Sequence, residues 1–194
     1  MAILQIKSKK YIDELIGKLS HLDSSALNYA LESLQKLQNK KDQNIESEET
    51  AFWQLIDKID WQKKSDDARL QPLIDALSAN SSADIFRFSE QLALKLYNLD
   101  GPQFAEALEK DELGFSADTF LYTRCLVVAK GEGFYKNVIK NPNEMPLGKD
   151  FEALLYVAEK AYFQKNKKPY NYVPTTNYES FFNQKLWGSQ AISL

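Results

Sequence analysis

The chain has 194 residues, of which 44% are hydrophobic and 12% aromatic, so it can fill a sizeable core and is too apolar for general disorder. Seven glycines and six prolines are few for an all-β chain, and a single cysteine cannot form an internal disulfide. The net charge is −3, the first residues lack a signal-peptide core, and no apolar run approaches the roughly 18 residues that cross a bilayer, so we expect a cytoplasmic protein with no membrane partner.

The first predicted elements form an N-terminal helical hairpin over residues 1–45. Two segments with helical periodicity are separated by the turn HLDSS, and the second begins at one of its serines. The apolar face of the second helix consists of Leu27, Ala30, Leu31, Leu34 and Leu37. Residues 38–48 are polar and aperiodic, which predicts a linker between this extension and a main domain over residues 46–194.

Apolar residues recur with helical periodicity through most of the main domain. Apolar spacing predicts helices around Phe52, over residues 65–79 and from Ser82 to the stop signal Asp-Gly-Pro at 100–102, and Pro72 must lie in the first turns of its helix or bend it. Further helices are predicted around 103–111, 134–140 and 149–165, followed by an extended tail over 166–176 and a last short helix or turn over 177–187. No strand pattern competes. The sequence therefore predicts an all-α fold, a single helical-bundle-like domain with the hairpin as an extension.

The stretch FSADTFLYTRCLVVAKGEGFY, residues 115–135, predicts a central helix. Ser116 is a natural N-cap, Asp118 adds favourable charge to the first turn, and apolar residues then cover most of the circumference. Gly131 suits a left-handed position at the helix end. Arg124 must be paired or reach the edge of the core, and we expect a structural ion pair with a carboxylate. GEG has neither dinucleotide-binding nor P-loop spacing.

The candidates for catalysis are few. His21, the only histidine, is expected in an exposed turn, and Cys125 is expected to be a small core residue rather than a nucleophile. One histidine and one cysteine cannot supply a usual zinc site, and no nucleophile–base arrangement stands out. We therefore expect a protein that is not an enzyme and needs no cofactor. The alternative is an enzyme or regulatory domain of unknown activity that acts through surface carboxylates.

Several short motifs resemble the bacterial domain family of unknown function DUF4240. They are ETAFWQLID at 49–57, IFRFSEQLALKLYNLD at 85–100, FSADTFLYTRCLVVAKGEGFY at 115–135, NPNEM at 141–145, FEALLYVAEKAY at 151–162 and ESFFNQKLW at 179–187. The family often has a tryptophan-rich turn followed by Gly-Gly-Cys-Ser-Asp-Asp, of which this chain keeps only Ser116 and Asp118. The resemblance implies a helical fold and carries no established chemistry.

The C-terminal segment is rich in aromatic residues, and two interpretations stay open. The rings can strap the tail onto the helical body, or they can form a docking surface for another protein. The residues are Tyr170, Tyr172, Tyr178, Phe181, Phe182 and Trp187.

The charge distribution suggests a binding protein. Residues 1–41 carry +3 and residues 160–194 carry +4, so residues 42–159 carry −10, which makes nucleic acid a poor partner. We expect an immunity protein that neutralises a cognate, basic bacterial toxin by occluding its active site. The stretch 99–118 holds six acids against one lysine and is the predicted partner-binding surface: Asp100, Glu106, Glu109, Asp111, Glu112 and Asp118.

Overall fold

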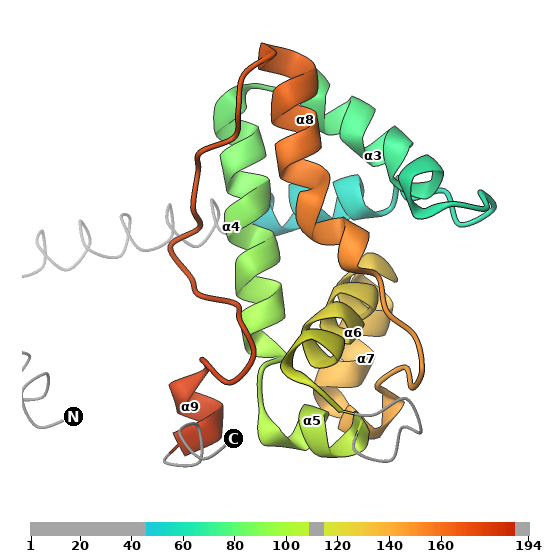
Figure 1. Cartoon of the computed structure of the whole chain (residues 1–194), viewed down its shortest axis with the longest axis vertical. Helices are drawn as coiled ribbons and strands as arrows, with labels where there is room; N and C mark the ends of the chain where they lie inside the picture. Colours follow the sequence, from blue (N-terminus) through green and yellow to red (C-terminus); the bar gives the residue numbers. More distant parts are fainter. Residues whose placement is uncertain (1–45, 109–114, 189–194) are drawn as a thin grey trace, which may run out of the picture. The chain divides into compact units, whose positions relative to one another are not determined.

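The computed structural model describes residues 46–108 and 115–188, and in these ranges the chain is helical and contains no strand (Figure 1). The all-α prediction is confirmed for this part of the chain. The described residues from Glu48 onward belong to one compact unit. The predicted hairpin, residues 1–45, lies outside the described residues, as do residues 109–114.

The helices follow one another with short connections. Residues 46–56 are helical, and a loop leads to α3 (Asp66–Ala79) and α4 (Ser82–Asn98). The remaining α-helices are α5 (Pro102–Leu108), α6 (Ala117–Ala129), α7 (Glu132–Lys140), α8 (Val157–Asn166) and α9 (Gln184–Trp187), with two 3₁₀ turns, η1 (Pro142–Glu144) and η2 (Glu152–Tyr156). The long helix predicted over 149–165 is therefore confirmed only in its second half, α8, because its first half is loop and 3₁₀ turn. Pro72 is accommodated within a continuous α3.

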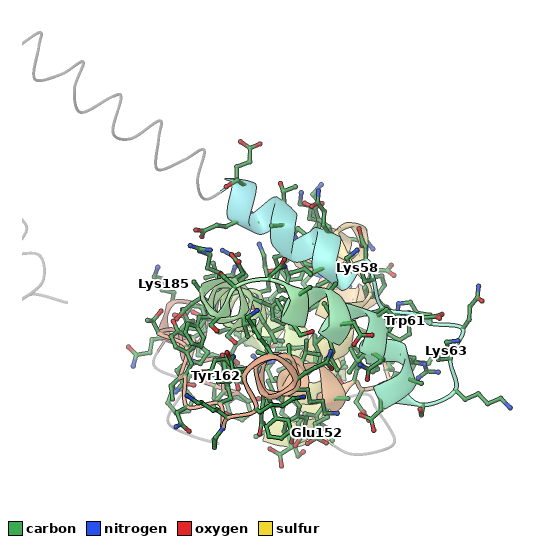
Figure 2. The ribbon with its side chains drawn as sticks, turned by 90° about the horizontal axis from the view of Figure 1, so that it is seen from above. Lys58, Trp61, Lys63, Glu152, Tyr162 and Lys185 are labelled. Carbon is green, nitrogen blue, oxygen red and sulfur yellow. The ribbon has the colours of Figure 1, made fainter. Side chains whose placement is uncertain are left out.

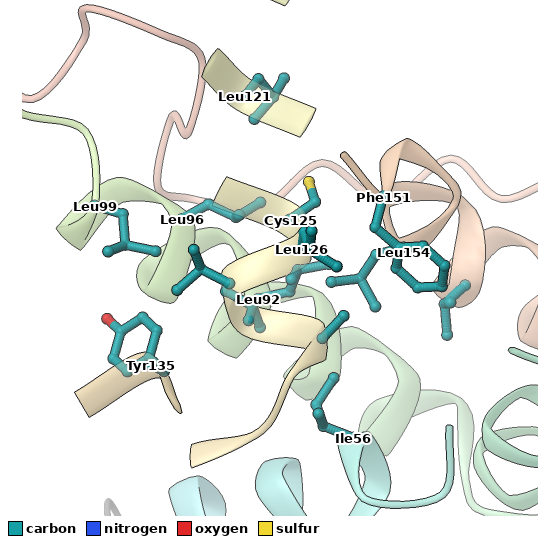
Figure 3. Close-up of a cluster of buried hydrophobic side chains, with 14 of the residues drawn as sticks. Ile56, Leu92, Leu96, Leu99, Leu121, Cys125, Leu126, Tyr135, Phe151 and Leu154 are labelled. Atoms are coloured by element: carbon teal, nitrogen blue, oxygen red, sulfur yellow. The ribbon is translucent and has the colours of Figure 1, made fainter. Parts of the chain in front are cut away.

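The core forms around α4 and α6. In Figure 1, α4 and α8 run side by side, and α8 packs against both α3 and α4. α6 packs against α4, α7 and η2 and is buried around most of its circumference, as the sequence predicted for a central helix. Figure 3 shows the side chains of α4 and η2 on the two sides of α6, with Cys125 and Leu126 between them.

Polar side chains fix the helix starts. Ser116 accepts a hydrogen bond from the amide of Thr119, whose side chain reaches back to the Ser116 amide, so the predicted N-cap of α6 is confirmed. Ser81 and Asp84 form the same reciprocal box at α4. Gly131 has a positive φ of 90° but an extended ψ, and it links α6 directly to α7 rather than forming a left-handed cap.

After α8 the chain runs as an extended strap along α4 before reaching α9 (Figure 1). The side chain of Tyr172 stacks on Phe86 with ring centroids 4.4 Å apart, and its hydroxyl donates to Glu90 at 2.6 Å. Thr175 donates to the same carboxylate through its amide and its hydroxyl. These contacts hold the strap on the outer face of α4.

Candidate protein-binding surface

Asp100 does not belong to an exposed acidic surface, so this part of the partner-site prediction is wrong. The residue is fully buried, and its carboxylate accepts four hydrogen bonds from the C-terminal segment. The donors are the amides of Phe181 (2.8 Å), Phe182 (2.7 Å) and Asn183 (2.8 Å) and the indole N–H of Trp187 (2.9 Å). Hydrogen bonds to an ionised acceptor are the stronger kind, so Asp100 serves as an anchor for this segment.

Arg124 is structural, but it has no direct carboxylate partner among the described residues. Its guanidinium is fully buried and donates to the carbonyls of Leu96 (2.9 Å) and Tyr178 (3.1 Å) and to the hydroxyl of Ser180 (2.8 Å). It also lies 4.6 Å from the ring centroid of Phe120. Desolvation lowers the pKa of Arg124, and the nearby charge of Asp100 opposes that shift. The expected ion pair is thus replaced by neutral acceptors.

Asp100 and Arg124 together form a clamp that holds residues 178–187. The segment adopts a positive φ of 73° at Phe181, a costly conformation for a non-glycine residue that the surrounding bonds maintain. Of the predicted C-terminal aromatics, Phe181 and Trp187 pack against the core and Tyr170, Tyr172 and Tyr178 are at least partly buried. The strap interpretation is confirmed for these five.

Phe182 is the exception among the aromatics. Its side chain is 55% exposed and lines a groove of about 350 Å³ together with Leu94, Tyr97, Thr175, Thr176 and Asn177. Because the neighbouring amides are bound to Asp100, the groove has a fixed wall.

The other predicted acids divide into two groups. Glu106 on α5 and Asp118 in the first turn of α6 are exposed. Glu109, Asp111 and Glu112 lie outside the described residues. The structure therefore shows two of the six acids at the surface and buries one.

Asp118 lies next to a group of acids and tyrosines that the sequence did not reveal. Tyr122 follows one helical turn later, and Glu152 and Tyr156 of η2 are close to it. The Tyr156 hydroxyl donates to the Glu152 carboxylate at 2.8 Å. We call this group, with Glu159 of α8, the acidic–tyrosine surface, and it consists of Asp118, Tyr122, Glu152, Tyr156 and Glu159. In Figure 2, Glu152 lies at the edge of the molecule.

The tyrosine pKa values reflect this surrounding. Desolvation raises the pKa of Tyr122, and the charges of Glu152 and Asp118 raise it further. The pKa of Tyr156 is raised first by its hydrogen bond to Glu152 and then by the charges of Glu152 and Glu159. Both phenols are therefore neutral donors at pH 7. A spacing of four residues, 118 to 122 and 152 to 156, is the sequence signal that could have indicated two such pairs.

The described residues offer little support for a metal site or a catalytic cysteine. Among the described residues, no group of three His, Cys, Asp or Glu side chains could hold a metal ion. Burial raises the pKa of the Cys125 thiol to about 12, which makes it unreactive at pH 7. His21 lies outside the described residues. A search of the described helices finds none whose length and apolarity would suffice to cross a membrane.

Comparison with known proteins gives one match. The family model described as "Protein of unknown function (DUF4240)" matches residues 48–164, which is more than half of the chain. The motif at 179–187 lies beyond this match. Neither the curated proteins nor the solved structures contain a match.

Proposed function

The chain belongs to the DUF4240 family, and on the evidence of its own surface we propose that it is a non-catalytic binding protein. More specifically, we propose an immunity protein that neutralises a cognate bacterial toxin by binding over the toxin's active site. The observation that carries this proposal is the acidic–tyrosine surface, in which two tyrosines stand among three carboxylates on rigid elements.

The charge of this surface suits a basic partner. Asp118, Glu152 and Glu159 lie within the segment 42–159 that carries −10 in total. Charge of one sign over a surface steers an oppositely charged partner into place and raises the association rate at low salt. A basic toxin is a partner of this kind.

The tyrosines add apolar ring area and hydrogen-bonding hydroxyls to the charge of the surface. Tyrosine is enriched at protein interfaces because a large ring is buried at little cost in conformational entropy and the hydroxyl still finds a hydrogen-bond partner. Tyr156 is 43% exposed, so burial of its ring remains available to a partner. Glu152 already orients its hydroxyl.

The backbone beneath these side chains is well fixed. The amide of Phe151 donates to the carbonyl of Tyr122 at 3.1 Å, and the Thr123 hydroxyl donates to the carbonyl of Lys149 at 3.1 Å. These bonds tie the loop that carries Glu152 to the α6 helix. A preorganised surface loses less entropy on binding.

The test begins with the neighbouring gene. We expect it to encode a toxin, and co-expression of this chain should restore growth of cells that produce that toxin. Binding of the purified pair is then measured at low and high salt for the double variant Asp118→Lys with Glu152→Lys. The matched control is Glu46→Lys with Glu144→Lys, which changes the same charge at two exposed residues that do not belong to this surface.

We expect the first variant to weaken binding and reduce its salt dependence, while the control binds like the unmodified protein. Equal effects of the two variants would show that only net charge matters and would remove this surface from the proposal. A metabolic neighbour and no rescue of growth would refute the immunity function itself.

A further inference from the structure

Trp61 is exposed at the surface, in contrast to the two other tryptophans. It lies in the loop between the helical residues 46–56 and α3, and 42% of its surface is accessible, against 3% for Trp53 and 6% for Trp187. Figure 2 shows Trp61 together with Lys58 and Lys63 toward one end of the molecule, away from Lys185.

Two cations lie against this one indole. The guanidinium carbon of Arg69 is 5.8 Å from a Trp61 ring centroid, and the ammonium nitrogen of Lys130 is 5.7 Å from it. Significant cation–π pairs occur about once in 70–80 residues, so two on one exposed ring are a notable concentration.

The ring and its cations are held in place. Phe151 packs against Trp61 at 5.1 Å, and Lys130 also lies 5.5 Å from the ring of Phe134. Arg69 donates through Nε to the carbonyl of Lys63 at 2.9 Å. The loop itself is closed by a hydrogen bond from the Asp60 amide to the Arg69 carbonyl at 2.9 Å. The three side chains are thus arranged before any ligand arrives.

The positive charge beside Trp61 is only partly neutralised by carboxylates of the described residues. Lys130 makes no ion pair with another described residue. Arg69 pairs with Asp66 through Nη1 at 2.7 Å, and its Nη2 donates no hydrogen bond to a described residue. Carboxylates do occur nearby. Asp60 lies in the same loop and Asp57 lies against Gly131.

This balance of charges favours one kind of ligand. Residues 57–69 hold four acids and four bases, and Lys130 adds one further positive charge beside the indole. A densely charged polyphosphate would be repelled by the four acids and by the acidic body. A peptide with one or two separated carboxylates can reach the two cations and place an apolar side chain on the indole.

We propose that Trp61, Arg69 and Lys130 form a docking site for a carboxylate-bearing peptide segment of a partner protein. The site is separate from the acidic–tyrosine surface, and its test does not depend on the immunity function. Binding pairs a carboxylate with the cations beside the indole and buries the exposed part of the ring, as at interfaces where tryptophan and arginine dominate the energy.

The experiment uses the full chain and a short blocked peptide in which leucine alternates with glutamate. Trp61 is the exposed fluorophore, so its emission reports binding, and calorimetry provides a readout that does not need the indole. The comparison peptide has glutamine in place of glutamate, and a short oligothymidylate represents nucleic acid. The variants are Lys130→Gln and Trp61→Ala, with Lys140→Gln, an exposed lysine at the end of α7, as the matched control.

We expect saturable binding of the glutamate peptide, weaker binding of the glutamine peptide, and a loss of about three- to fivefold for Lys130→Gln, the size expected for one solvent-exposed charge pair. Trp61→Ala should abolish the calorimetric signal, and Lys140→Gln should bind like the unmodified chain. Equal binding of the two peptides, an equal loss in both lysine variants, or tighter binding of oligothymidylate than of the glutamate peptide would each overturn the proposal.

Discussion

Removal of the Asp100 carboxylate tests the clamp most directly. Asp100→Ala leaves four donors, two of them in fully buried hydrogen bonds, without their acceptor: three backbone amides and the indole of Trp187. A hydrogen bond to a charged group contributes about 1.5–3 kcal/mol. If residues 178–187 kept their position in the variant, the loss of four such bonds would lower the unfolding free energy by about 6 kcal/mol or more. Water reaches some of these groups once the segment moves, and the expected loss in unfolding free energy is about 3–5 kcal/mol, as for other broken buried charge networks.

Urea unfolding followed by far-UV circular dichroism and tryptophan emission measures this loss. With a slope of about 1–3 kcal/mol per molar urea, the midpoint should fall by at least 1 M. The tryptophan emission should shift to longer wavelength because Trp187 becomes exposed to water. Asp118→Ala is the matched control, since that carboxylate is exposed. It removes only a favourable charge in the first turn of α6, worth about 0.3–1 kcal/mol, so its midpoint should fall much less. A loss below about 1 kcal/mol for Asp100→Ala would refute the clamp as a source of stability.

The same clamp predicts coupling between its two charged residues. Arg124→Met should also destabilise the protein by several kcal/mol, because the carbonyls of Leu96 and Tyr178 lose their donor and Asp100 loses a nearby positive charge. The double variant Asp100→Ala with Arg124→Met should cost less than the sum of the two single changes. Additive losses, or an Arg124→Met protein of unchanged stability that fails to bind a partner, would contradict this account.

Two further predictions use the titrating groups. The Cys125 thiol should react slowly with a thiol reagent in the native protein and readily in denaturant, because burial raises its pKa to about 12; fast native labelling would contradict the central position of α6. The pKa of Glu49 is lowered chiefly by its hydrogen bond from Lys95 at 2.5 Å, so its contribution to stability is complete above the ordinary value of 4.5 and is lost as the pH falls below it. Glu49→Gln should therefore flatten the acid side of the curve of unfolding free energy against pH.

Local signals in the sequence predicted most of the helices. Ser116 caps α6 because a hydroxyl followed by free amides is sufficient for an N-cap. The predicted stop at 100–102 lies just after the end of α4 at Asn98, and Pro102 takes the first position of α5, where proline is favoured. The first half of the helix predicted over 149–165 was wrong for the opposite reason. Phe151 and Leu154 are spaced like helix residues, yet tertiary contacts with α6 hold Phe151 at the N-cap of η2 and Leu154 within this 3₁₀ turn.

The candidate surfaces were less predictable because they are assembled from distant segments. An aspartate before Gly-Pro is typical of a turn. No residue near Asp100 in the sequence indicates that its four hydrogen-bond donors lie 81 to 87 positions later. Tyr122 and Glu152 likewise come from separate elements. Glu106 and Asp118 were found at the surface because an isolated acid on a helix is normally solvated.

The clamp also bears on where the folding unit ends. The family match stops at residue 164, and it includes both Asp100 and Arg124. Their hydrogen-bond partners at 178–187 lie beyond it. A chain cut at 164 would leave a carboxylate and a guanidinium in an apolar core without most of their partners, at a cost comparable to the whole stability of a small domain. The segment up to Trp187 is therefore part of the folded domain, and any binding measurement on either surface requires a chain that contains it.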